Sequence, residues 1–119
     1  SYCVESYPHL VKPHLKVLVR ALRQEGLHDA VKRSIVRLLQ YAEIPRPLQG
    51  EVASHCFGYL ADPGVPPAIR IFSMTVLENL AAQNQDLKSE LRIVLEDHLP
   101  YGSSGFVNRG RKVLKRMSQ

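Results

Sequence analysis

The stretch whose residue types could do chemistry is a basic run near the end of the chain, residues 109–116. Its cations are Arg109, Arg111, Lys112, Lys115 and Arg116, with no acidic residue between them. Positive groups at this density can contact phosphates or carboxylates by charge alone. No aromatic residue interrupts the run, which gives little support for binding single strands by base stacking. The alternative is a solvated terminal helix whose last cations favour the negative end of its dipole.

A second candidate is the Gly-Ser-Ser-Gly sequence at residues 102–105. Backbone amides at a helix start can bind an anion, and glycine allows close approach to the backbone. The anion-binding candidates are Ser103, Ser104 and Gly105. The simpler interpretation is a turn in which one of the two serines caps the last helix.

Other arrangements typical of enzymes or metal sites are missing from the sequence. The histidines include no i,i+4 pair and no His/Cys spacing typical of zinc. There is no Gly-x-Ser-x-Gly motif and no phosphate-binding loop. Gly102-Ser103-Ser104 is similar to the opening of the adenylosuccinate lyase signature loop, but residues 105–108 do not continue that motif. We therefore predict no enzyme activity, no cofactor and no metal.

Length and composition predict one domain spanning residues 1–119. Hydrophobic residues make up 45% of the chain and charged residues 23%, which is ordinary for a globular protein. No apolar run approaches the roughly 18 residues of a membrane span, and no signal-peptide pattern opens the chain. The two cysteines, Cys3 and Cys56, stand alone, which favours a reducing, cytoplasmic location. Cys56 lies among apolar positions and is expected to be a small buried hydrophobe.

The net charge of +5 is concentrated at the two ends of the chain. Residues 1–46 hold eight Lys or Arg and four Asp or Glu, and residues 47–99 hold three and seven. Residues 100–119 hold five cations and no acid. A basic surface is therefore expected only at the ends, which counts against nucleic-acid contact over the whole molecule.

Six helices are expected to position these side chains. Prolines and glycines separate segments with apolar residues at helical spacing, at about residues 13–26, 28–42, 47–60, 65–82, 85–99 and 104–118. Segment 65–82 is apolar around most of its circumference, so we expect it at the centre. Segment 28–42 is expected to bury Ala30, Val31, Ser34, Ile35, Leu38, Leu39 and Ala42. No segment shows sustained period-two alternation, so the fold class is all-α.

A repeat groups these helices into three antiparallel pairs, 13–42, 47–82 and 85–118. Leu38, Leu77 and Leu114 follow one another at intervals of 39 and 37 residues. Each comes four residues after a small residue, which would let a neighbouring helix approach closely; these are Ser34, Ser73 and Gly110. The pattern resembles HEAT and armadillo-type repeats, which implies a short alpha-alpha superhelix.

The chain further resembles a family of small bacterial HEAT-like proteins that have no established activity. The residues carrying this likeness are Lys32-Arg33, Arg37-Leu38-Leu39-Gln40, Ile44-Pro45, Cys56-Phe57, Phe72-Ser73-Met74-Thr75-Val76-Leu77, Glu90-Leu91 and Arg109-Gly110-Arg111-Lys112-Val113-Leu114.

In such a solenoid the second helix of each pair lines the concave surface. The resemblance therefore implies a basic groove containing Arg33, Arg37, Arg70 and Arg109. Alternatively, these side chains bridge neighbouring repeats through Glu43, Glu78 or Glu96, with their stems covering apolar surface. The residues leave both interpretations open.

Two functions follow from this interpretation. The first is a non-enzymatic interaction module that binds an acidic protein segment on the basic concave face. The alternative is nucleic-acid binding by the same groove together with Arg111, Lys112, Lys115 and Arg116, in a fold class similar to that of helical-repeat DNA glycosylases. The acidic middle of the chain counts against the alternative, and the basic last helix counts for it.

Overall fold

The computed structural model describes residues 14–118, and every regular element in this range is a helix. The helices are α2 (Leu15–Ala21), α3 (Asp29–Leu39), α4 (Arg46–Ala61), α5 (Pro67–Ala81), α6 (Gln85–His98), the short 3-10 helix η3 (Leu99–Tyr101) and α7 (Ser104–Met117). The all-α prediction is confirmed. None of the helices within 14–118 combines the length and the apolar character that a membrane crossing needs.

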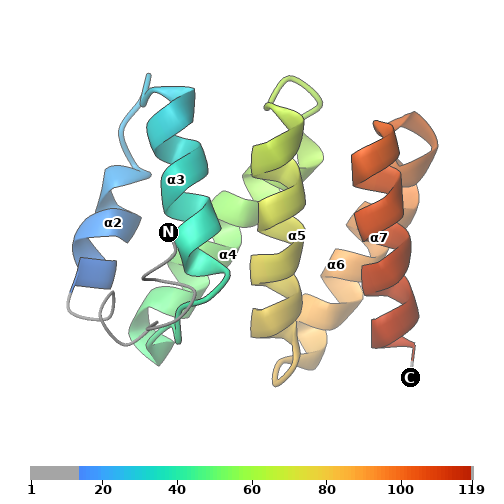
Figure 1. The fold of residues 1–119 in the computed structure, drawn as a ribbon. Coiled ribbons are helices and arrows are strands. Elements are labelled where there is room, and N and C mark those ends of the chain that lie inside the picture. The colour runs from blue at the N-terminus through green and yellow to red at the C-terminus, as the bar shows by residue number, and fades with distance from the viewer. Residues whose placement is uncertain (1–13, 119) are drawn as a thin grey trace.

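The helices form two layers. α3, α5 and α7 lie side by side in one layer, with α4 and α6 behind them (Figure 1). α5 contacts α3, α4, α6 and α7, so every α-helix of residues 14–118 except α2 packs directly on it. The expected central place of this helix is therefore confirmed.

The sequence of α5 explains both its start and its position. Pro66 is the N-cap and Pro67 the first helical residue, where a missing N–H costs little. The buried residues of α5 are Ile69, Arg70, Ser73, Met74, Val76, Leu77, Leu80 and Ala81. Together with Ile71 and Phe72, which are partly buried and pack against the core, these positions extend around more than half of the helix circumference, so α5 has to be covered from several sides at once.

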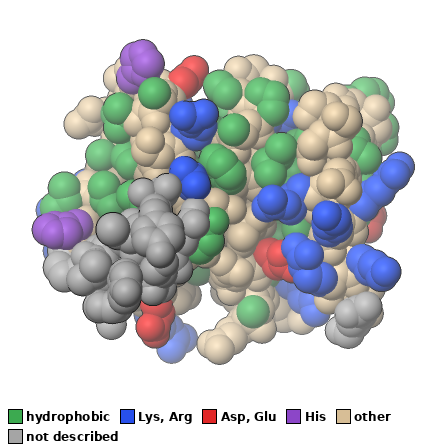
Figure 2. Space-filling model, in the orientation of Figure 1, with side chains coloured by type: hydrophobic (Ala, Val, Ile, Leu, Met, Phe, Trp, Pro, Cys, Tyr) green, Lys and Arg blue, Asp and Glu red, His purple; other side chains and the backbone are tan. Residues whose placement is uncertain are grey.

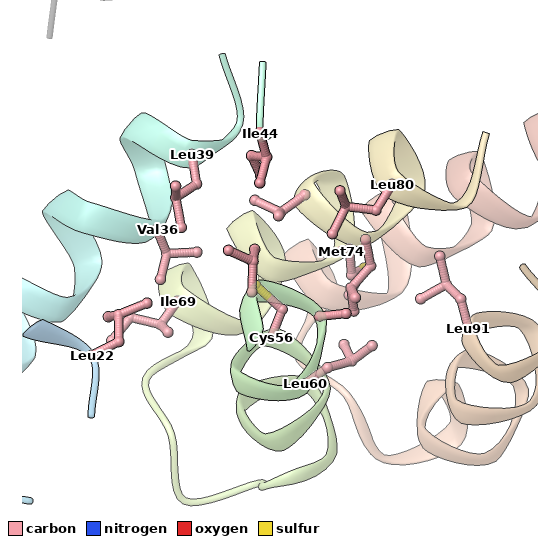
Figure 3. Packing of buried hydrophobic residues seen from close by; sticks show 14 of the residues in the cluster. Leu22, Val36, Leu39, Ile44, Cys56, Leu60, Ile69, Met74, Leu80 and Leu91 are labelled. Atoms are coloured by element: carbon pink, nitrogen blue, oxygen red, sulfur yellow. The ribbon is translucent and has the colours of Figure 1, made fainter. Parts of the chain in front are cut away.

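The core runs continuously from the first helix pair to the last. Figure 3 shows Cys56 and Leu60 of α4 close to Met74 of α5, with Leu91 of α6 on one side. Cys56 is fully buried, and burial raises the pKa of its thiol to about 12. The expectation that this residue acts as a small hydrophobe is therefore confirmed.

The predicted apolar face of the second helix is wrong in part. Val36 is fully buried, whereas Ala30, Val31 and Ser34 are exposed. The face that α3 turns to the core is formed by Ile35, Val36 and Leu39. The 11-residue helix is shorter than expected, and its buried stripe is narrower than the sequence pattern suggested.

The three small residues of the repeat have different structural roles. A Cβ on Gly110 would lie 2.7 Å from Leu99 Cδ2, so this glycine permits a close contact between α7 and η3. Ser73 is fully buried, and its hydroxyl donates to the Ile69 carbonyl at 2.8 Å. Ser34 is exposed and lies at no helix contact of this kind, so the close approach expected in the first pair is not present.

We predict that Leu77→Ala lowers the free energy of unfolding by about 2–5 kcal/mol, as truncation of a buried leucine does. Leu77 is 0% exposed on α5. The measurement is chemical denaturation followed by circular dichroism. Ile93→Ala is the matched control. Ile93 is 67% exposed on α6, so its truncation should lower the free energy of unfolding only slightly. Equal losses in the two variants would contradict the central position of α5.

Candidate interaction surface

The last helix, α7, presents most of the candidate cations. The Ser103 hydroxyl accepts a hydrogen bond from the Phe106 N–H at 3.3 Å and fixes the start of the helix. Phe106, Gly110, Val113 and Met117 form the buried face. The cations therefore lie on the sides and on the outer face of α7, and Figure 2 shows Lys and Arg side chains gathered there.

Two of these cations connect α7 to α5. Arg109 Nη1 donates to Thr75 Oγ1 at 2.6 Å. Arg116 donates through Nε and Nη2 to the two carboxylate oxygens of Glu78, at 2.7 and 2.8 Å. The bond to Glu78 raises the pKa of Arg116. For these two residues the structure favours the bridging interpretation, and Glu78 is one of the partners expected from the sequence.

Three further cations of α7 point away from the protein. Arg111, Lys112 and Lys115 are all exposed. Within residues 14–118 they make no hydrogen bond, ion pair or ring contact. We call these three residues the α7 cationic patch. They span slightly more than one turn, so their charges lie within about 6 Å along the helix axis.

Arg70 does not belong to the exposed surface, which corrects its expected role in a basic groove. Its side chain is 8% exposed and donates through Nε and Nη2 to the Leu60 carbonyl, at 3.1 and 2.8 Å. Its guanidinium also lies 4.3 Å from the centre of the Phe106 ring. Burial lowers its pKa.

The position of Arg70 has a physical reason. Leu60 is in the last turn of α4, where carbonyls lack a partner within the helix. A buried cation at this negative helix end satisfies the carbonyl and interacts favourably with the helix dipole. Arg70 therefore joins the second helix pair to the third and is not available to a partner.

Of the four arginines predicted to line the basic groove, the two not yet described lie on α3, across α5 from the patch. Arg33 is exposed, whereas Arg37 is partly buried and already engaged with another group. Between them and α7, the outward residues of α5 are uncharged except for Glu78, which is paired. The structure thus does not join the predicted arginines into one continuous basic groove.

The anion loop is explained in part by the helix cap. Ser103 uses its hydroxyl to accept a hydrogen bond from the Phe106 N–H, and Gly102 lies so close to the Phe106 ring that a Cβ would clash with it. The capping interpretation therefore accounts for Ser103 and Gly102. Anion binding by Ser103, Ser104 and Gly105 stays a prediction.

Sequence reasoning missed a polar cluster at the opposite end of the molecule. Arg23, beyond α2, donates to both carboxylate oxygens of Glu51 at 2.6 Å, and His55 Nε2 lies 3.0 Å from Glu51 Oε2. Tyr59 stacks on His55, and Lys32 Nζ lies 5.2 Å from the Tyr59 ring centre. The i,i+4 spacing of Glu51 and His55 could have revealed half of this cluster. The partner Arg23, 28 residues away, had no local signal.

The described residues contain no group of three or more His, Cys, Asp or Glu side chains placed to hold a metal ion.

Comparison with known families agrees with this architecture. A family model described as a HEAT repeat domain matches residues 2–117. Three successive helix pairs in two layers, together with this match, show that the chain belongs to the HEAT repeat family. HEAT repeats generally mediate protein interactions. No curated protein and no solved structure matches the chain. The narrower resemblance to a bacterial family stays a prediction.

Acid titration of Glu51 should weaken the fold. Hydrogen bonds from Arg23 and His55 lower the pKa of Glu51 from 4.5 to about 2. Because the folded-state pKa is depressed, the stabilisation is complete above pH 4.5 and is lost as the pH falls towards 2. The difference in urea midpoint between the native chain and Glu51→Gln should narrow over this window. Glu90→Gln, on the exposed side of α6, is the control. If the difference in urea midpoint between the native chain and Glu51→Gln did not change with pH, the link between Glu51 titration and stability would be contradicted.

Replacing Arg70 should destabilise the protein without affecting exposed charge. We expect Arg70→Met to cost about 1–3 kcal/mol, because the buried Leu60 carbonyl loses its donor. Arg70→Lys retains a cation but cannot donate two N–H groups to one carbonyl while stacking on Phe106, so it should recover only part of this loss. Denaturation curves measure both variants. If Arg70→Met were as stable as the native chain, the capping role would be wrong.

Proposed function

We propose that this protein is a non-enzymatic interaction module that binds an acidic protein segment on its α3–α5–α7 side. The observation that carries the proposal is the α7 cationic patch, Arg111, Lys112 and Lys115. These three side chains are exposed and make no hydrogen bond or ion pair within residues 14–118. Cations without an internal partner are available to carboxylates of a partner, where each exposed pair contributes modestly and a cluster contributes more.

The neighbouring contacts support this assignment. Arg109 and Arg116 are held by Thr75 and Glu78, which joins α7 to α5 and gives the patch a rigid base. A preformed surface loses less conformational freedom on binding than a flexible tail. α7 itself contains no acidic residue, so nothing on the same helix neutralises the patch.

Nucleic-acid binding is the second candidate, supported by the same patch. Phosphate contacts would require cations spread along a backbone, and longer tracts of contact give a steep salt dependence. Burial of Arg70 and the pairing of Arg116 leave a compact group of three cations and not an extended groove. This compactness favours a short acidic protein segment.

The patch variant Arg111→Ala, Lys112→Ala, Lys115→Ala should weaken the binding of an acidic peptide. The probe is a fluorescent peptide of glutamates, titrated with the full chain and followed by anisotropy. We expect a loss of affinity of roughly three- to a hundredfold, since three exposed ion pairs of a few tenths to one kcal/mol each are removed. The control variant is Lys16→Ala, Arg20→Ala, Arg46→Ala, which removes the same charge from other exposed positions.

The same titration with duplex and single-stranded DNA and RNA, over a salt series, separates the two candidates. Tight peptide binding with weak nucleic-acid binding supports the proposal. Nucleic-acid binding that is stronger than peptide binding and falls steeply with salt would favour the second candidate. Equal affinities of the patch and control variants for the peptide would rule out the patch as its site.

A further inference from the structure

An apolar strip lies on α5 beside the α7 cationic patch. Ala68, Ile71 and Phe72 are partly exposed on the outward side of α5, over its first two turns. We call these three residues the α5 apolar strip. In Figure 2 hydrophobic side chains gather over the upper part of α5, and Lys and Arg side chains gather over the middle and lower part of α7.

Contacts between α5 and α7 fix how far apart the two surfaces lie. Ile71 is level with Gly105, because a Cβ on this glycine would lie 3.3 Å from Ile71 Cδ1. The bond between Arg109 and Thr75 lies one turn further on. Lys112 follows Gly105 by seven residues, so it lies about 10 Å further along the helix direction, at 1.5 Å per residue.

The order of the two surfaces follows from the shared direction of the two helices. α5 and α7 both begin at the top of Figure 1 and end at the bottom. The apolar strip therefore lies at the N-terminal end of this helix pair, and the cationic patch lies towards the C-terminal end. A segment that lies along α5 and α7 meets first one surface and then the other.

We propose that the partner of this surface is a bipartite segment, with apolar side chains that lie on the α5 apolar strip and a cluster of carboxylates that lies on the α7 cationic patch. The inference rests on the proposed binding of an acidic segment and adds the second contact. Along the helix direction the two parts are offset by about 10 Å, which corresponds to two turns of a helix or to three extended residues.

The chemistry of the two surfaces explains why both contacts are needed. Exposed ion pairs give steering and modest affinity, and they discriminate poorly between acidic sequences. Burial of apolar side chains adds affinity that salt does not screen. At the level of the α5 apolar strip neither α5 nor α7 presents an exposed cation, so a carboxylate placed there would find no partner on these two helices. The surface therefore selects for acids at one end of the segment.

The test compares two fluorescent peptides of equal length and net charge. Each has a glutamate cluster; in one, a pair of leucines lies two helical turns from the cluster, and in the other, serines replace them. We expect the leucine peptide to bind the full chain about tenfold more tightly, from partial burial of two side chains. Its advantage should persist at high salt, while the binding of the serine peptide weakens.

Ala68→Glu tests the strip from the protein side. An acidic residue in the first turn of α5 suits the helix dipole, so the fold should be retained, which thermal unfolding checks. This variant should reduce the affinity of the leucine peptide to that of the serine peptide. The control is Ser89→Glu, which adds the same charge at an exposed position on α6.

The outcomes separate this inference from the proposed function. If both peptides bind equally, and both lose affinity in the patch variant, the acidic-segment function stands and the bipartite partner is overturned. If neither peptide binds, or if the patch variant binds both as the native chain does, both proposals fail. Stronger binding of duplex DNA than of either peptide, unaffected by Ala68→Glu, would assign the patch to phosphates and would also overturn both.

Discussion

A helix that is apolar around most of its circumference cannot lie at the edge of a small protein, and α5 imposes this constraint on the whole chain. It contacts α3, α4, α6 and α7, so the order of the layers follows from the need to cover it. Leu77 and Met74 have no exposed surface, and packing at this density leaves little freedom for the neighbouring helices. The orientation of α7, and with it the place of the exposed cations, is a consequence of how α5 is buried.

Burial of α5 also determines which cations remain outside. Arg70 lies on its buried side, so its charge is used to cap the last turn of α4 through the Leu60 carbonyl. Arg109 and Arg116 reach back to α5 and hold the two helices together. The three arginines thus stabilise contacts between repeats. Exposed positive charge is left on the outer side of α7, where no α5 group lies within reach.

The sequence predicted the helices well because local signals mark their ends. Prolines before α4 and α5 and the Ser103 cap fixed those starts, and apolar spacing identified Val52, Cys56 and Leu60 as buried. The role of Arg70 could not be predicted in this way. Its partners are a carbonyl 10 residues earlier and a ring 36 residues later, and neither leaves a periodic signal. The same limit applies to Arg23 and Glu51.

The difference between anchored and exposed cations bears on the choice between protein and nucleic acid. Arg116 and Glu78 form an ion pair without net charge, so this arginine contributes little positive charge to the surface. What remains is a short positive segment beside uncharged, partly apolar α5 residues. A phosphate backbone would bring a charge to every level of that surface, including the level of the α5 apolar strip, where α5 and α7 present no exposed cation. A protein segment can place acids at one end and apolar groups at the other, so its chemistry can match both parts of the surface.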